Sequence, residues 1–258
     1  MSEVPGAPRT RPVAVRRYPE GDGDDRVAVE QPLEMRVEGV ATAVTMRTPG
    51  DDFDLVLGFL ATEGVIDGVD DVRAVAEVGE NTVDVRLAEG VPATRARSAD
   101  RQLYANSSCG ICGIASIDRL LKQGRPLPRW EPDPRMLATL PGRLRPLQPG
   151  FDATGGLHAA AIFDASGALT GLREDVGRHN AVDKVLGARL RADDLRFEGQ
   201  GLLVSSRAGF EIVQKALVLG VPVVATVGSP TSLAVDAAVR AGLVLYGWVR
   251  GDRCTRYA

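Results

Sequence analysis

The C-terminal half of the chain repeats one pattern, in which an apolar strand leads through a short polar turn into a helix. Residues 201–207 (GLLVSSR) precede a helix predicted over 210–219. Residues 221–227 (VPVVATV) precede the turn GSPTS and a helix predicted over 233–241. A last apolar strand follows at 243–249. Strand, turn, helix and strand in this order are typical of parallel βαβ units, so the sequence predicts a mixed sheet with helices on both faces.

An apparent hairpin precedes this repeat. Residues 157–164 and 168–173 flank the turn Ala-Ser-Gly, and a helix is predicted over 179–190. With the repeat, these segments make residues 151–258 one α/β domain.

The N-terminal half has the pattern of a small α+β unit, assigned to residues 26–124. Short segments rich in Val, Met and Thr between 27 and 47 predict strands, and Gly39 marks a hairpin. A helix is predicted from Phe53, because the apolar residues there share one face and acidic residues occupy the first turn. Residues 72–78 and 82–87 predict a second hairpin.

Two segments lack such patterns. Residues 1–25, rich in Pro, Gly, Arg and Asp, are predicted to be a mobile tail. Residues 125–150 contain many prolines and are predicted to be a linker with one short helix around Met136.

Composition excludes several classes of protein. The formal net charge of -3 argues against a general nucleic-acid binder. The longest apolar stretch, 217–227, is broken by glycine and proline, which argues against a membrane span, and no secretory signal is visible at the N-terminus. Three cysteines do not make a disulfide framework, so a cytoplasmic, reducing location is the expectation.

The loop SSCGICG at 107–113 is the sharpest chemical feature. Glycines after Cys109 and Cys112 let the backbone turn and let another molecule approach. A helix is predicted to follow, and its N-terminus favours a thiolate over a thiol. We expect this loop to be poorly ordered without a partner. Cysteines flanked by Ser and Gly rarely pack a core, although a buried apolar pair stays open.

Four chemistries compete for this cysteine pair. A redox dithiol would follow a strand in a βαβ context, whereas polar residues precede this loop and a proline-rich segment follows its helix. A structural zinc site needs four ligands, and the remaining Cys254 and two histidines lack paired spacing. A zinc deaminase would show His-x-Glu before Pro-Cys-x-x-Cys, which this chain lacks. A persulfide carrier needs only one exposed, activated cysteine.

Other polar segments lie at the ends of predicted strands. His158 begins one strand, and a hydrogen-bonded core histidine is an equally good interpretation. Residues 173–184 (REDVGRHNAVDK) could meet an anion or form a solvated helix face. The turns at 205–207 and 228–232 could bind phosphate or simply cap helices.

The end of the last strand offers groups suited to a guanine nucleotide. The side chains comprise an aromatic ring, two guanidiniums and a carboxylate, and the segment is Trp248, Val249, Arg250, Gly251, Asp252 and Arg253. Guanine can be recognised by stacking and hydrogen bonds, and pyrophosphate by arginine.

Taken in order, these segments resemble the formate dehydrogenase accessory sulfurtransferases, the FdhD family. The matching pieces are SSCGICG at 107–113, FDATGGLHAAA at 151–161, REDVGRHNAVDK at 173–184, SSRAGFEIVQKA at 205–216 and GSPTSLAVDAA at 228–238. Together they are specific, although each alone would be weak.

The resemblance implies a function beyond what spacing shows. Family members accept sulfur from a cysteine desulfurase as a persulfide and pass it to bis-molybdopterin guanine dinucleotide, the molybdenum cofactor of formate dehydrogenase. The persulfide position maps onto Cys109, with Cys112 as an assistant, and the cofactor-binding stretch maps onto residues 248–253. The resemblance also implies a cytidine-deaminase-like C-terminal fold and a homodimer. No metal or permanently bound cofactor is expected. A non-catalytic cofactor-binding chaperone and a thiol–disulfide oxidoreductase remain alternatives.

Overall fold

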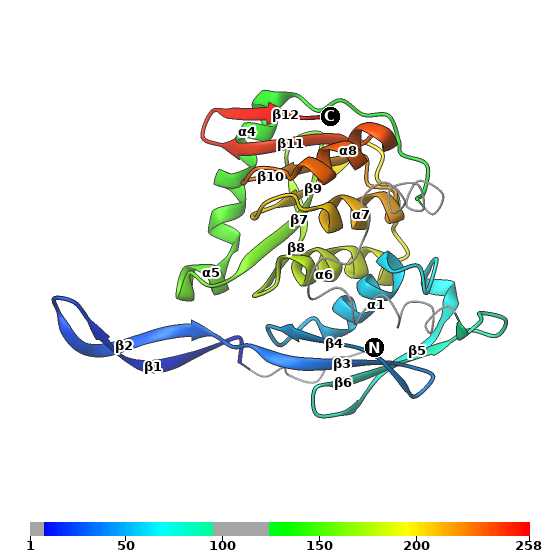
Figure 1. Ribbon diagram of the computed structural model, residues 1–258, viewed down its shortest axis with the longest axis horizontal. Coiled ribbons are helices and arrows are strands. Elements are labelled where there is room, and N and C mark those ends of the chain that lie inside the picture. The colour runs from blue at the N-terminus through cyan, green and yellow to red at the C-terminus, as the bar shows by residue number, and fades with distance from the viewer. Residues whose placement is uncertain (1–7, 95–123) are drawn as a thin grey trace.

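The computed structural model describes residues 8–94 and 124–258, and its larger part is a six-stranded mixed sheet (Figure 1). The strand order is β12-β11-β10-β9-β7-β8. The strands are β7 (His158–Asp164), β8 (Leu169–Asp175), β9 (Gln200–Val204), β10 (Val223–Thr226), β11 (Val244–Arg250) and β12 (Arg253–Arg256).

Strand direction brings the ends of four strands to one edge of this sheet. β9, β10 and β11 pair in parallel, while β7 is antiparallel to both β8 and β9. β8 through β11 therefore all end at the same edge, where β7 and the antiparallel β12 begin. We call this side the carboxyl edge.

Helices cover both faces of the sheet, as the sequence predicts (Figure 1). Inward positions alternate along each strand, because successive side chains point to opposite faces. Ala160, Ile162 and Leu202 join the core with α6 (Arg178–Arg191), α7 (Phe210–Leu219) and α8 (Ser232–Ala241). Ala161 and Phe163 join the opposite core with α4 (Pro134–Leu144).

The N-terminal unit is a second sheet packed on one helix. Its strand order is β4-β3-β6-β5, and its elements are β3 (Gln31–Val37), β4 (Val40–Arg47), α1 (Asp52–Thr62), η1 (Val69–Asp71), β5 (Val72–Gly79) and β6 (Thr82–Leu87). Both predicted hairpins and the helix from Phe53 are confirmed. The parallel pairing of β3 with β6 joins the two hairpins into one sheet.

Helices α1 and α6 join the two units through an unusually close crossing. A Cβ built on Gly58 would lie 1.9 Å from the carbonyl oxygen of Asp183, and one on Gly187 would lie 1.8 Å from that of Asp54. Backbone meets backbone at this crossing, so only glycine fits at these two positions.

The prediction of a mobile tail over residues 1–25 is wrong from residue 10 onward. β1 (Thr10–Arg17) and β2 (Gly21–Ala28) form an antiparallel hairpin that projects from the body (Figure 1). Its base is tied to the body, since Arg9 forms an ion pair with Asp51. The Asp- and Gly-rich sequence of β2 has low strand propensity, which is why composition alone gave no strand there.

The prediction of a linker over 125–150 is also wrong in part. The short helix around Met136 is confirmed as α4, and η2 (Arg145–Leu147) and α5 (Pro149–Thr154) follow it. Pro134 and Pro149 stand in the first turn of a helix, where the missing N–H is no loss. The segment forms a layer on the sheet rather than a connection between domains. Among the described residues, no helix is long and apolar enough to cross a membrane.

Candidate functional site

The carboxyl edge gathers the polar segments that the sequence singled out. The turn after β9 contacts the turn after β10, with the Gly228 amide donating to the Ser206 carbonyl over 3.1 Å. The turn after β10 in turn contacts the end of β11, because the Trp248 amide donates to the Gly228 carbonyl over 3.1 Å. At the other side, the Ser205 amide donates to the carbonyl of Ala159, the residue after His158, over 2.9 Å.

A bulge at the end of β11 turns Trp248 toward solvent. The strand register shifts between Gly247 and Arg250, and Trp248 has a left-handed backbone with φ of 53°. Trp248 is 39% exposed, and the Arg250 guanidinium lies 4.8 Å from the centroid of its ring. Val249, by contrast, is fully buried in the core beneath α4, so only its backbone could meet a ligand.

The turn that follows is open to solvent. Gly251 adopts a positive φ of 64°, which glycine tolerates without strain, and it reverses the chain into β12. Asp252 and Arg253 are both exposed. The predicted nucleotide segment thus presents one aromatic ring, two guanidiniums and a carboxylate on one accessible corner. Its role in binding stays a prediction.

The chain has two histidines, and both lie at this edge. Burial and the charges of Arg178 and Lys215 lower the pKa of His179 to about 4. Burial and Arg178 also lower the pKa of His158. The buried His179 Nε2 has no hydrogen-bond partner among the described residues, and Glu211 Oε2 lies 3.9 Å from it. At neutral pH both imidazoles are therefore uncharged.

Most of the polar segment 173–184 does not face this edge but holds the N-terminal unit. The buried Lys184 Nζ lies 2.8 Å from Asp175 Oδ2 and donates to the Thr48 carbonyl over 2.8 Å. Arg173 donates to Asp54, a residue fully buried in α1, over 2.8 Å. Buried charges need such partners, so these residues anchor α1 and its flanks.

A second buried cluster continues this junction. Lys215 Nζ lies 2.9 Å from Asp183 Oδ2, and the Thr62 hydroxyl donates to Asp183 over 3.0 Å. Burial raises the pKa of Asp183 to about 6, although the positive charge of Lys215 and its hydrogen bond act to lower it. Sequence reasoning missed these roles, because the partners in the N-terminal unit lie more than a hundred residues away in the sequence.

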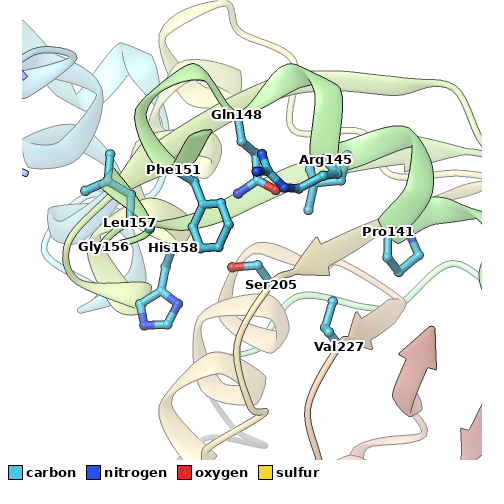
Figure 2. A pocket seen from close by; sticks show the side chains of 11 residues that line it. Pro141, Arg145, Gln148, Phe151, Gly156, Leu157, His158, Ser205 and Val227 are labelled. Carbon is cyan, nitrogen blue, oxygen red and sulfur yellow. The ribbon is translucent and has the colours of Figure 1, made fainter. Parts of the chain in front are cut away.

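A cavity of about 380 Å³ opens between the layer formed by α4, η2 and α5 and the carboxyl edge (Figure 2). Its polar wall comprises Arg145, Gln148, His158 and Ser205, and the Phe151 ring forms part of its apolar wall. Five of its lining residues come from the segment FDATGGLH, whose role the sequence left open.

The described residues hold no group of three or more metal-ligating side chains. Cys254 lies 3.6 Å from the Pro134 carbonyl oxygen, and burial raises the pKa of its thiol. A neutral, half-buried thiol is a poor nucleophile. Cys109, Cys112 and the helix predicted after them lie outside the described residues.

Comparisons with known proteins agree on one family. The profile of the FdhD/NarQ family matches residues 28–258. A protein of Streptomyces avermitilis named sulfur carrier protein FdhD is 47% identical over 251 residues, covering 91% of this chain and 87% of its own length. One of the same name from Anaeromyxobacter dehalogenans is 50% identical over 250 residues, with 91% and 87% covered.

A solved structure shares the fold. The crystal structure of a protein from Desulfotalea psychrophila, described as a formate dehydrogenase accessory protein, matches with a TM-score of 0.75. The match covers 96% of this chain and 95% of that chain at 23% sequence identity.

Proposed function

This chain belongs to the FdhD/NarQ family, and from that premise we propose that it is a sulfur carrier required for formate dehydrogenase activity. It accepts sulfur from a cysteine desulfurase and delivers it to the bis-molybdopterin guanine dinucleotide cofactor before the client enzyme takes that cofactor. The observation that supports this most is the close identity to sulfur carrier proteins along nearly the whole chain.

Sulfur acceptance is a thiol–persulfide exchange. The Cys109 thiolate attacks the outer sulfur of the desulfurase persulfide, the S–S bond there breaks, and the desulfurase thiolate leaves. No net oxidation occurs. If the Cys112 thiolate then attacked the persulfide on Cys109, hydrosulfide would leave and a disulfide would remain, the two thiols having supplied the electrons.

The carboxyl edge is the proposed cofactor site. Trp248 can stack on a guanine ring, while Arg250 and Arg253 can form charge-assisted bonds with pyrophosphate. Three helices, α6, α7 and α8, begin at this edge, so their dipoles also favour an anionic ligand. The cofactor is cargo here, held by protein groups while sulfur reaches it. We further propose a homodimer in a reducing, cytoplasmic location.

Two other functions predict different chemistry. A non-catalytic chaperone for the cofactor would need only the carboxyl edge and would survive loss of both loop cysteines. A thiol–disulfide oxidoreductase would need both cysteines and would carry no sulfur.

Intact-mass spectrometry after incubation with a cysteine desulfurase and cysteine separates these three. We expect a reducible adduct of one sulfur atom, lost in Cys109→Ala and kept in Cys254→Ala, the matched control. No adduct on the wild-type protein would leave the chaperone. Loss of two hydrogens without added mass in the wild type, together with no sulfur adduct on Cys112→Ala, would favour the oxidoreductase.

A further inference from the structure

The hairpin of β1 and β2, which we call the arm, has no core of its own. Both strands are described in full, and no residue of either strand is buried. Isolated two-stranded hairpins are marginally stable in water, and the aspartates and glycines of β2 are poor strand formers. A partner that covers the arm would supply the burial that it lacks.

Cross-strand contacts nevertheless hold the arm in one shape. Every residue of β1 pairs with a residue of β2. Arg17 donates to the Asp24 carbonyl over 2.9 Å and lies 3.3 Å from Asp25, and Arg26 donates to the Thr10 hydroxyl over 2.6 Å. A binding element that is already ordered loses little conformational entropy when a partner takes it up, which favours affinity.

The tip of the arm carries the most exposed large apolar or aromatic side chain among the described residues. Tyr18 is 98% exposed, whereas the next of these, Val44, is 66% exposed. Tyrosine is one of the residues that most often dominate the binding energy of an interface, because its ring buries a large area and its hydroxyl can still form a hydrogen bond. The tip therefore suits an apolar pocket in a partner.

The charges of the arm disfavour edge-to-edge pairing with the arm of a second copy. A two-fold axis would set β1 against β1 or β2 against β2, since an isologous contact uses the same surface twice. Three exposed arginines lie on β1 and three exposed aspartates on β2, namely Arg11, Arg16 and Arg17, and Asp22, Asp24 and Asp25. Like charges would then face each other across the new pair, which is destabilising.

Area disfavours packing two arms face to face. Strands of eight residues are about 27 Å long and a two-stranded ribbon is about 10 Å wide, so one face offers about 270 Å². Two such faces fall well short of the roughly 1,200 Å² that a stable interface buries in total. A cleft that encloses both faces and the tyrosine at the tip would bury about 700–800 Å² of the arm, close to one partner's share of a standard interface.

The position of the arm indicates which partner it meets. At its base, a Cβ on Gly156 would lie 3.6 Å from the Ala28 Cβ, and Gly156 lines the cavity beside the carboxyl edge. The arm extends on the side of the molecule toward which β11 points (Figure 1). A protein that takes the cofactor from the carboxyl edge would therefore lie alongside the arm. The family profile begins at residue 28, so the arm lies outside the part of the chain that matches the family, as suits contact with a particular client.

We propose that the arm docks the client formate dehydrogenase, which holds it in a cleft with an apolar pocket for Tyr18. The walls of that cleft present acidic groups to β1 and basic groups to β2. This inference rests on the proposed function, because it names the surface through which the client approaches the cofactor. It gives the arm a role separate from the sulfur chemistry of Cys109 and from the nucleotide corner at residues 248–253.

Biolayer interferometry tests this with the full chain and a formate dehydrogenase of the same organism, purified without its molybdenum cofactor. Tyr18→Ala should weaken the complex about thirtyfold or more, the loss typical of a dominant aromatic residue. Arg16→Glu, which reverses the charge of a highly exposed side chain, should weaken it about tenfold, because like charges then meet across the interface. Val239→Ala is the control, since Val239 is exposed near the C-terminal end of α8, away from the carboxyl edge, and should leave affinity unchanged.

The opposing results are equally definite. Wild-type affinity in Tyr18→Ala, or no complex with the wild-type chain, would overturn the inference. Light scattering after size-exclusion chromatography gives the oligomeric state of the chain alone, which we expect to be the same in the wild type and in Tyr18→Ala. A smaller species in Tyr18→Ala would make the arm a contact between copies and would also overturn the inference.

The sulfur adduct on Cys109 and the affinity for GDP should both be unchanged in Tyr18→Ala, while activation of formate dehydrogenase should fall. A normal adduct together with a complex that does not depend on Tyr18 would overturn only this inference. A complex that depends on Tyr18, without an adduct on the wild type, would overturn only the carrier function.

Discussion

The crossing of α1 and α6 gives the most quantitative prediction, on the substitution Gly58→Ala. The new Cβ would lie 1.9 Å from the Asp183 carbonyl oxygen, and real Cβ atoms essentially never approach within 3.0 Å, so the two backbones must part by at least about 1.1 Å. That movement disturbs the buried pair of Lys215 and Asp183 at 2.9 Å. Overpacking together with a strained buried ion pair should lower the free energy of unfolding by about 3–5 kcal/mol.

Urea unfolding followed by far-UV circular dichroism measures this effect. Gly142→Ala is the matched control, because Gly142 also lies inside a helix but a Cβ there meets nothing within 4 Å. The control should raise the free energy of unfolding by about 0.5–1 kcal/mol, the ordinary gain of alanine over glycine in a helix. If Gly58→Ala were neutral or stabilising like the control, the argument from backbone contact would be refuted.

Two further predictions concern the carboxyl edge. Arg250→Ala and Arg253→Ala should each weaken GDP binding by about 1–3 kcal/mol, measured by calorimetry, since each removes a charge-assisted bond; unchanged affinity in both would remove this corner from the site. His179→Gln should flatten the pH dependence of stability between about pH 6.5 and 4. The unfolded histidine takes up a proton near 6.5 and the folded one only near 4, so stability falls as pH drops through that window. Thermal unfolding from pH 7 to 4 tests this, and an unaltered slope would contradict it.

The sequence predicted elements well where local signals were strong. The helices α7 and α8 follow apolar strands and end at Gly220 and Gly242, which adopt the positive φ typical of helix C-termini. The ordering of parallel strands also brought the turns after β9 and β10 together, as the βαβ pattern requires.

Other features depend on partners distant in the sequence. β2 contains Asp22, Asp24 and Asp25, and its strand conformation comes from pairing with β1. β12, which the sequence did not predict, is four residues long and is defined by its pairing with β11. No local pattern could reveal either strand.

The sequence identified the polar segments of the candidate site. It did not separate the residues that lie at the carboxyl edge from those that hold the two units together. The sequence left residues 173–184 open to two interpretations, an anion-binding group or a solvated helix face. In the structure Lys184 and Asp175 are instead fully buried against Thr48, while His179 lies at the carboxyl edge. Periodicity cannot separate these roles, because Thr48, which accepts the hydrogen bond of Lys184, lies in the N-terminal unit.

Labelled-sulfur transfer followed by peptide mapping tests the central claim most directly. The desulfurase is supplied with ³⁵S-cysteine, and the labelled peptide is identified in the wild type and in each cysteine variant. We predict label on Cys109, no label and no activation of formate dehydrogenase in Cys109→Ala, and retained label with a smaller loss of activation in Cys112→Ala. Label on Cys112 in the wild type that survives in Cys109→Ala would contradict the account.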